Sequence, residues 1–214
     1  LLNSEIFKIE KKYQELTLLH EEMIKNKNTE SLGYKGLMEE NINRQDFHHA
    51  FIYGEKLFKL NPFIDKLYLT LVSIIGKTRN WNQLIYISKE AYNKKIIDQK
   101  LFNQNTGIAY YEISKIKKQS DPKESLNLIL KAIKIHGPFP PFIKLHLEIL
   151  LNMNESSKIN KVIKKYWNSD QSSSLRRVIT EFLKKNKMGN LENIKSIIKG
   201  SRDDKESKKL LLDF

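Results

Sequence analysis

The chain has 214 residues, no cysteine and a formal net charge of +13. The lack of cysteine excludes disulfides and thiolate metal sites, and an apolar content of 40% excludes wholesale disorder. The charge is uneven, because residues 1–60 carry 9 Lys/Arg against 10 Asp/Glu, residues 61–120 carry 10 against 4, and residues 121–214 carry 19 against 11. This excess favours an acidic partner, an anionic lipid surface or nucleic acid, unless the lysines only cover solvated helix faces.

A spacing of 34 residues organises the chain. Tyr13, Phe47 and Trp81 are 34 residues apart, each just after a polar break, and Ala50 aligns with Leu84 in the same frame. This period is typical of tetratricopeptide helix–turn–helix repeats. We therefore predict an all-α fold, a right-handed superhelical solenoid of tetratricopeptide-like repeats that forms a single domain over residues 1–214.

The predicted units cover about residues 1–28, 31–62, 63–97, 101–138, 140–168 and 172–200, with the start of another at 203–214. After the end of a first helix at 1–11, apolar residues at helical spacing predict helices at about 13–26, 31–44, 47–60, 63–78, 81–94, 101–118, 123–135, 142–152, 156–167, 175–185, 191–199 and 205–214. Asp46, Asn80 and Asp121 are predicted N-caps, and Pro62 ends the helix before it.

The turn at Ser120-Asp121-Pro122 comes seven residues later than the 34-residue period predicts, so seven extra residues lie either in the loop before the helix at 101–118 or in a lengthened helix. We predict the inward positions of this helix from apolar spacing alone as Ile108, Ala109, Ile113 and Ile116.

No sequence pattern for catalysis is present. The chain lacks a phosphate-binding glycine loop, a nucleophile elbow and a His-Glu-x-x-His motif. No two of the five histidines are spaced i, i+4, and no carboxylate joins them at ligand spacing. We therefore predict a protein that is not an enzyme and has neither a cofactor nor a metal site.

The aromatic residues could stack on nucleic-acid bases, but they fall at packing positions of the repeat. We favour a core role for Tyr13, Phe47, Phe51, Phe58, Tyr68, Trp81 and Tyr110.

A superhelix of paired helices creates a groove lined by the first helix of each pair, and such grooves hold extended peptides or partner helices. The alternative is that these side chains are merely exposed. The predicted partner-binding residues on this concave face are Lys35, Glu39, Lys66, Ser73, Tyr110, Ser114 and Lys117.

Several segments resemble the HemY-type tetratricopeptide proteins of proteobacteria, over most of residues 29–214. The similar segments are Thr29-Glu30-Ser31-Leu32-Gly33-Tyr34-Lys35-Gly36-Leu37, then Asp46-Phe47 with the following Ala50, Leu57 and Asn61-Pro62, then Asn80-Trp81, Ile96-Ile97-Asp98 and Asp203-Asp204-Lys205-Glu206-Ser207.

The resemblance implies a bacterial inner-membrane protein with N-terminal membrane helices and a soluble repeat region, which acts as a scaffold or regulator associated with haem biosynthesis. Its protein partners would then include haem-pathway enzymes. The chain itself holds no apolar run of the ~18–20 residues that a membrane span needs, and it begins at Leu1 rather than Met, so we expect a part of a longer protein.

Two rival functions remain open. The positive charge suggests an RNA-binding helical repeat, and a surface histidine or tyrosine could bind haem or porphyrin.

Overall fold

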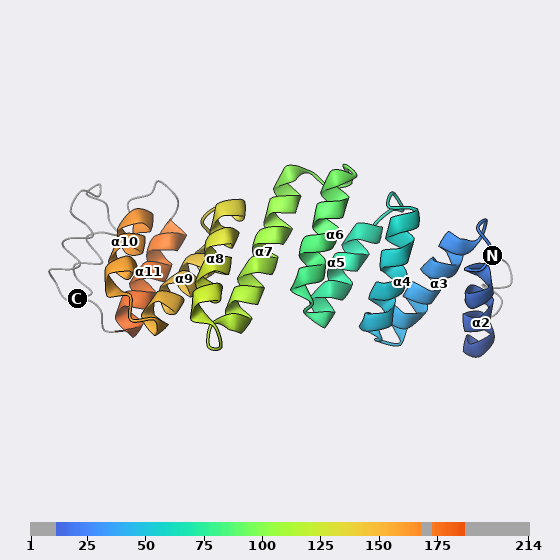
Figure 1. The fold of residues 1–214 in the computed structure, drawn as a ribbon, viewed down its shortest axis with the longest axis horizontal. Helices are drawn as coiled ribbons and strands as arrows, with labels where there is room; N and C mark the ends of the chain where they lie inside the picture. The colour runs from blue at the N-terminus through green and yellow to red at the C-terminus, as the bar shows by residue number, and fades with distance from the viewer. Residues whose placement is uncertain (1–11, 168–172, 187–214) are drawn as a thin grey trace. The chain divides into compact units, whose positions relative to one another are not determined.

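The computed structural model describes residues 12–167 and 173–186, and within these ranges the chain forms ten α-helices and no strand (Figure 1). The helices are α2 (Tyr13–Met23), α3 (Glu30–Asn43), α4 (Phe47–Leu60), α5 (Leu67–Thr78), α6 (Trp81–Asn93), α7 (Gln99–Lys117), α8 (Pro122–His136), α9 (Pro140–Asn152), α10 (Ser156–Trp167) and α11 (Ser173–Lys185). The predicted all-α fold of paired helices is confirmed. The helices predicted at 1–11, 191–199 and 205–214 lie outside the described residues.

The chain divides into two compact units, residues 1–105 and 106–214. A single domain over the whole chain therefore stays a prediction. In the described part of the first unit, each helix from α2 to α5 packs against the next one along the chain. In the second, α8 packs against α9, and α9, α10 and α11 pack against one another.

Small residues allow the helices of the first unit to approach closely. A side chain at Gly33 would place its Cβ 2.7 Å from the carbonyl oxygen of His20, so only glycine fits where α3 crosses α2. Ala50 of α4 is fully buried, as predicted for the crossing of two paired helices.

Helix starts follow the predicted caps in most places. Asp46 accepts a hydrogen bond from the backbone N–H of His49 at 3.1 Å, and Asp121 accepts one from Glu124 at 3.0 Å. These bonds satisfy N–H groups that have no partner within the helix. Asn80 lies at the N-cap of α6 but makes no side-chain hydrogen bond there.

Helix α5 begins at Leu67, so the prediction that it begins at Phe63 is wrong. Lys66 has a φ of 58°, a left-handed conformation that interrupts a right-handed helix. Phe63 is 71% exposed in the preceding turn.

The predicted inward face of α7 is also wrong in part. Ile116 is 66% exposed and Ile108 39% exposed, although Ala109 is buried as predicted. The buried positions are mostly small residues instead, namely Thr106, Gly107, Ala109 and Ser114. Such residues permit a close helix crossing: a Cβ at Gly107 would lie 2.6 Å from the Cβ of His136 on α8.

The aromatic residues divide between core and surface. Phe51, Phe58 and Tyr68 are buried, so the predicted core role is confirmed for them. Tyr13 is 57% exposed, so the prediction is wrong there. The remaining three are partly buried, namely Phe47, Trp81 and Tyr110.

The core of the second unit joins α9, α10 and α11 around the fully buried Trp167. Ile143, Ile163 and Ile179, one from each helix, are also fully buried in this cluster. In residues 12–167 and 173–186, none of the helices is both long enough and apolar enough to cross a membrane.

Candidate functional site

A groove in the second unit is bounded by the end of α7, by α9 and by α11. It consists of two neighbouring cavities of about 330 and 500 Å³. Both are lined by Lys118, Lys144, Glu148, Val178 and Glu181. We call this hollow the α7/α9/α11 groove. Its cavities have the size of ligand-binding clefts in proteins.

Apolar side chains form the base of the groove. Leu145 and Phe182 are among its lining residues and are nearly fully buried. Val178 and Leu151 are only partly buried and remain open to an incoming group. An apolar side chain of a partner would therefore lose water-exposed surface on entering the groove.

Tyr111 of α7 closes one side of the groove. Its ring stacks on that of Phe142, with centroids 5.1 Å apart and planes 24° apart. Burial raises the pKa of the Tyr111 hydroxyl above its usual value, so this group stays neutral and can donate a hydrogen bond at physiological pH.

The groove carries five cations, three of which are paired with carboxylates. Lys118 Nζ lies 2.9 Å from Glu148, Lys115 Nζ lies 3.5 Å from Glu112, and Arg177 Nε lies 3.7 Å from Glu181. The other two cations, Lys144 and Lys185, are exposed and have no ion pair with any residue that the structure describes. Among the described residues, the groove thus presents two lysines without an ion pair above an apolar base.

The α7 residues predicted for a binding face lie outside this groove. Ser114 is fully buried, and its hydroxyl donates to the carbonyl oxygen of Ser125 on α8 at 2.8 Å. Tyr110 is partly buried, with Lys131 Nζ of α8 5.9 Å from its ring centre. Lys117 is partly buried and does not line either cavity. Ser114 cannot belong to an exposed surface, so its placement on the concave face is wrong.

In each case the residue that lines the groove is the one that follows the predicted residue in the sequence. These lining residues are Tyr111, Lys115 and Lys118. One residue rotates a side chain by about 100° around a helix. The seven residues by which this unit exceeds the 34-residue period removed the frame that could have fixed this rotation. The signal in the sequence was the run of small residues, since Gly107 and Ser114 mark the face packed on α8.

In the first unit, the predicted residues are mostly exposed. Lys35 and Glu39 of α3 form an i, i+4 pair at 3.9 Å, with side chains about half exposed. Ser73 of α5 is exposed, and Lys66 precedes that helix as its exposed N-cap residue. Their role in binding stays a prediction.

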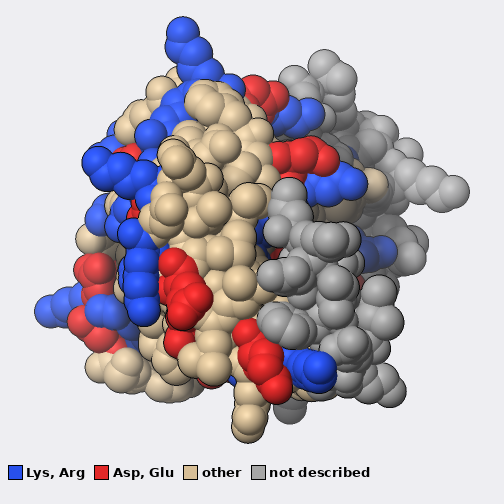
Figure 2. Space-filling model, turned by 90° about the vertical axis from the view of Figure 1, so that its right-hand side faces the viewer, with Lys and Arg blue, Asp and Glu red and all other residues tan. Residues whose placement is uncertain are grey.

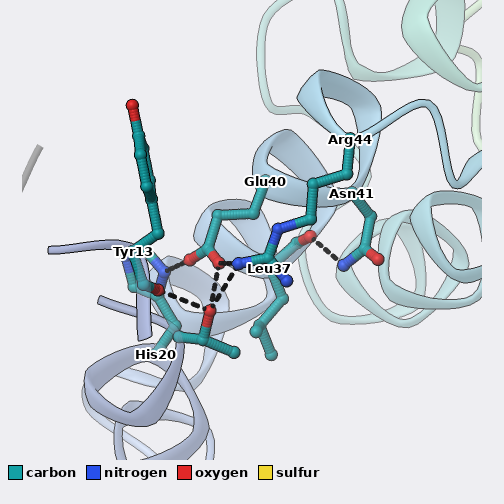
Figure 3. A network of polar contacts seen from close by, with 7 residues as sticks. Tyr13, His20, Leu37, Glu40, Asn41 and Arg44 are labelled. Carbon is teal, nitrogen blue, oxygen red and sulfur yellow. Dashed lines mark hydrogen bonds and ion pairs between the residues drawn. The ribbon is translucent and has the colours of Figure 1, made fainter. Parts of the chain in front are cut away.

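A buried polar network joins α2 to α3 (Figure 3). His20 Nδ1 lies 2.5 Å from Glu40 Oε1, and Thr17 donates to Glu40 Oε2 at 2.6 Å. Arg44 Nη2 donates to Thr17 at 3.0 Å. Burial alone would raise the pKa of Glu40, but the hydrogen bonds from His20 and Thr17 and the charges of His20 and Arg44 lower it below its usual value.

A cavity of about 570 Å³ lies beside this network, lined by residues such as Tyr13, Gly36 and Glu39. On the face shown in Figure 2, uncharged side chains form a strip with Lys and Arg along one side and Asp and Glu at several points beside it. The network satisfies its own polar atoms, so its direct role is to hold α2 against α3.

The described residues contain no group of three or more His, Asp or Glu side chains that could hold a metal ion. His146 of α9 is 6% exposed, and its Nδ1 has no hydrogen-bond partner among the residues that the structure describes. Burial lowers its pKa from 6.5 to about 4, with a smaller contribution from the charge of Lys165. This histidine is therefore neutral at physiological pH.

No protein-family model matches the chain, and no curated protein matches it. Among solved structures, the chain is similar to a thermophilic TPR protein of Thermus thermophilus. The sequence identity is 12% and the TM-score 0.36, with 86% of this chain and 97% of the other covered. The assignment of paired helices rests on the contacts described above.

Proposed function

We propose that the protein is a non-catalytic scaffold for protein–protein interaction and that the α7/α9/α11 groove binds its partner. The observation that carries this proposal is an open hollow with an apolar base and a charged rim. Partner-binding surfaces combine these features, because apolar burial supplies affinity and the charged rim supplies specificity.

The partners proposed here are enzymes of haem biosynthesis. This rests on the resemblance of the repeat segments to HemY-type proteins, together with the interaction groove. In that case the chain is the repeat region of a longer bacterial protein held at the inner membrane.

The test is affinity purification of the full-length protein from its own membranes, followed by mass spectrometry. Val178→Trp would fill the groove from α11, whereas Asn160→Trp introduces the same side chain at an exposed position on α10 and serves as the control. We expect haem-pathway enzymes to be retained by the wild type and by the control but lost from Val178→Trp. Equal retention by both variants would contradict a role for the groove, and absence of these enzymes from all three would contradict the haem-pathway assignment.

A second candidate function is RNA binding, which the net charge of +13 favours. Binding that is dominated by phosphate contacts weakens linearly with the logarithm of salt concentration. Retention of RNA at ~50 mM salt with such a slope would support this function. The absence of any retention at low salt would exclude it.

A further inference from the structure

We propose that the α7/α9/α11 groove takes an acidic peptide segment, with an apolar side chain seated at Val178 and carboxylates facing Lys144 and Lys185. This inference rests on the proposed interaction function and adds the chemistry of the partner.

The charges of the groove favour a negatively charged ligand over a positively charged one. The carboxylates of Glu148 and Glu181 are already engaged by Lys118 and Arg177. Lys144 and Lys185 are exposed in the same cavity and have no such pair within the described ranges. An acidic group would meet these two lysines, whereas a basic segment would have to displace the existing ion pairs of Glu148 and Glu181.

The ion pair of Lys118 with Glu148 strengthens this preference for an acidic ligand. This pair links the end of α7 to α9, and both side chains are only about a quarter exposed. The pair is therefore better shielded from solvent than the Arg177–Glu181 pair, whose side chains are 79% and 62% exposed. Glu148 therefore interacts with Lys118 and does not pair with Lys144.

The base of the groove favours a peptide over a polynucleotide. Val178 and Leu151 offer aliphatic surface rather than flat aromatic faces, and the ring of Tyr111 at the rim is already stacked on Phe142. Single-stranded nucleic acids are held by bases stacked on free aromatic rings.

The proposal is tested by fluorescence anisotropy with short labelled peptides of defined sequence. One peptide alternates Asp with Leu, a second has Asn in place of each Asp, and a short poly(U) strand is the third probe. The full chain is compared with Lys144→Glu/Lys185→Glu and with Lys123→Glu/Lys134→Glu. The latter changes the total charge equally, at exposed lysines of α8 outside the groove.

The Asp/Leu peptide is expected to bind the wild type and the α8 variant alike, and to lose about tenfold in affinity on Lys144→Glu/Lys185→Glu. An equal loss in both double variants would overturn the proposal, since the attraction would then come from the overall charge. Tighter binding of poly(U) than of the peptide, weakened by the groove variant, would overturn it in favour of a nucleic-acid site.

The preference for acidic peptides and the use of the groove as a binding site can be refuted separately. If the Asn/Leu peptide binds as tightly as the Asp/Leu peptide and Val178→Trp abolishes both, the acidic preference is wrong while the groove remains a binding site. If Val178→Trp leaves binding of both peptides unchanged, the groove itself is not the site.

Discussion

Gly36→Ala is predicted to destabilise the first unit, although alanine is the better helix former. In a helix interior the substitution by itself gains about 1 kcal/mol. The new Cβ, however, would lie 2.3–2.5 Å from three ring atoms of His20. That ring is 5% exposed and bonded to Glu40. Displacing the ring costs about 1–3 kcal/mol for overpacking and about 1–3 kcal/mol for the buried Oε1 of Glu40, which loses its partner while Oε2 keeps Thr17. The net loss is about 1–5 kcal/mol.

The matched control is Gly76→Ala on α5. No atom lies within 4 Å of the position that a Cβ would take there, so we expect a gain of about 0.5–1 kcal/mol. Urea unfolding followed by far-ultraviolet circular dichroism gives the free energy of unfolding of each variant. Combining Gly36→Ala with His20→Ala should recover part of the loss, because the clash is removed. Equal stabilisation by both glycine substitutions would refute this account of the α2–α3 contact.

Three further predictions concern single side chains. Asp121→Ala should lower the free energy of unfolding by about 1 kcal/mol, because it removes a cap bond, whereas Asn80→Ala, which loses no such bond, should leave the denaturation midpoint nearly unchanged. Because α7 crosses α8 closely at this position, Ser114→Leu should lower the free energy of unfolding by about 1–3 kcal/mol and Ser114→Ala by no more than about 1.5 kcal/mol; equal losses in denaturant titrations would contradict a close crossing. His146, with a pKa lowered from 6.5 to about 4, is neutral in both states above pH 6.5, and as the pH falls towards 4 only the unfolded chain takes up the proton. Stability should therefore fall by up to about 3 kcal/mol across that window, and His146→Leu should flatten the pH profile; an unchanged slope would show that another group is responsible.

Local signals in the sequence were sufficient where each helix has its own start and stop. Helix α4 was predicted at its observed bounds, because Asp46 caps its start and Asn61 and Pro62 follow its end. Helix α10 was likewise predicted at residues 156–167, from regularly spaced apolar residues such as Ile159 and Ile163.

Local signals could not predict which face of α7 is buried. Apolar spacing placed Ile116 inward, but the close crossing with α8 buries Ser114 instead and leaves Ile116 in solvent. Buried hydroxyls are acceptable there because Ser114 and Ser125 satisfy one another's hydrogen bonds. A pattern that counts apolar residues cannot recognise such a polar, tightly packed face, and the groove residues were missed by one position for this reason.

The central claim, that the α7/α9/α11 groove is the partner-binding surface, is tested most directly by hydrogen–deuterium exchange. The full-length protein would be compared with and without the partner that Val178→Trp fails to retain. The account predicts slower exchange in α9 and α11 on binding, with α8 unchanged. Protection confined to α8 and α10, with exchange in α9 and α11 unaltered, would contradict it.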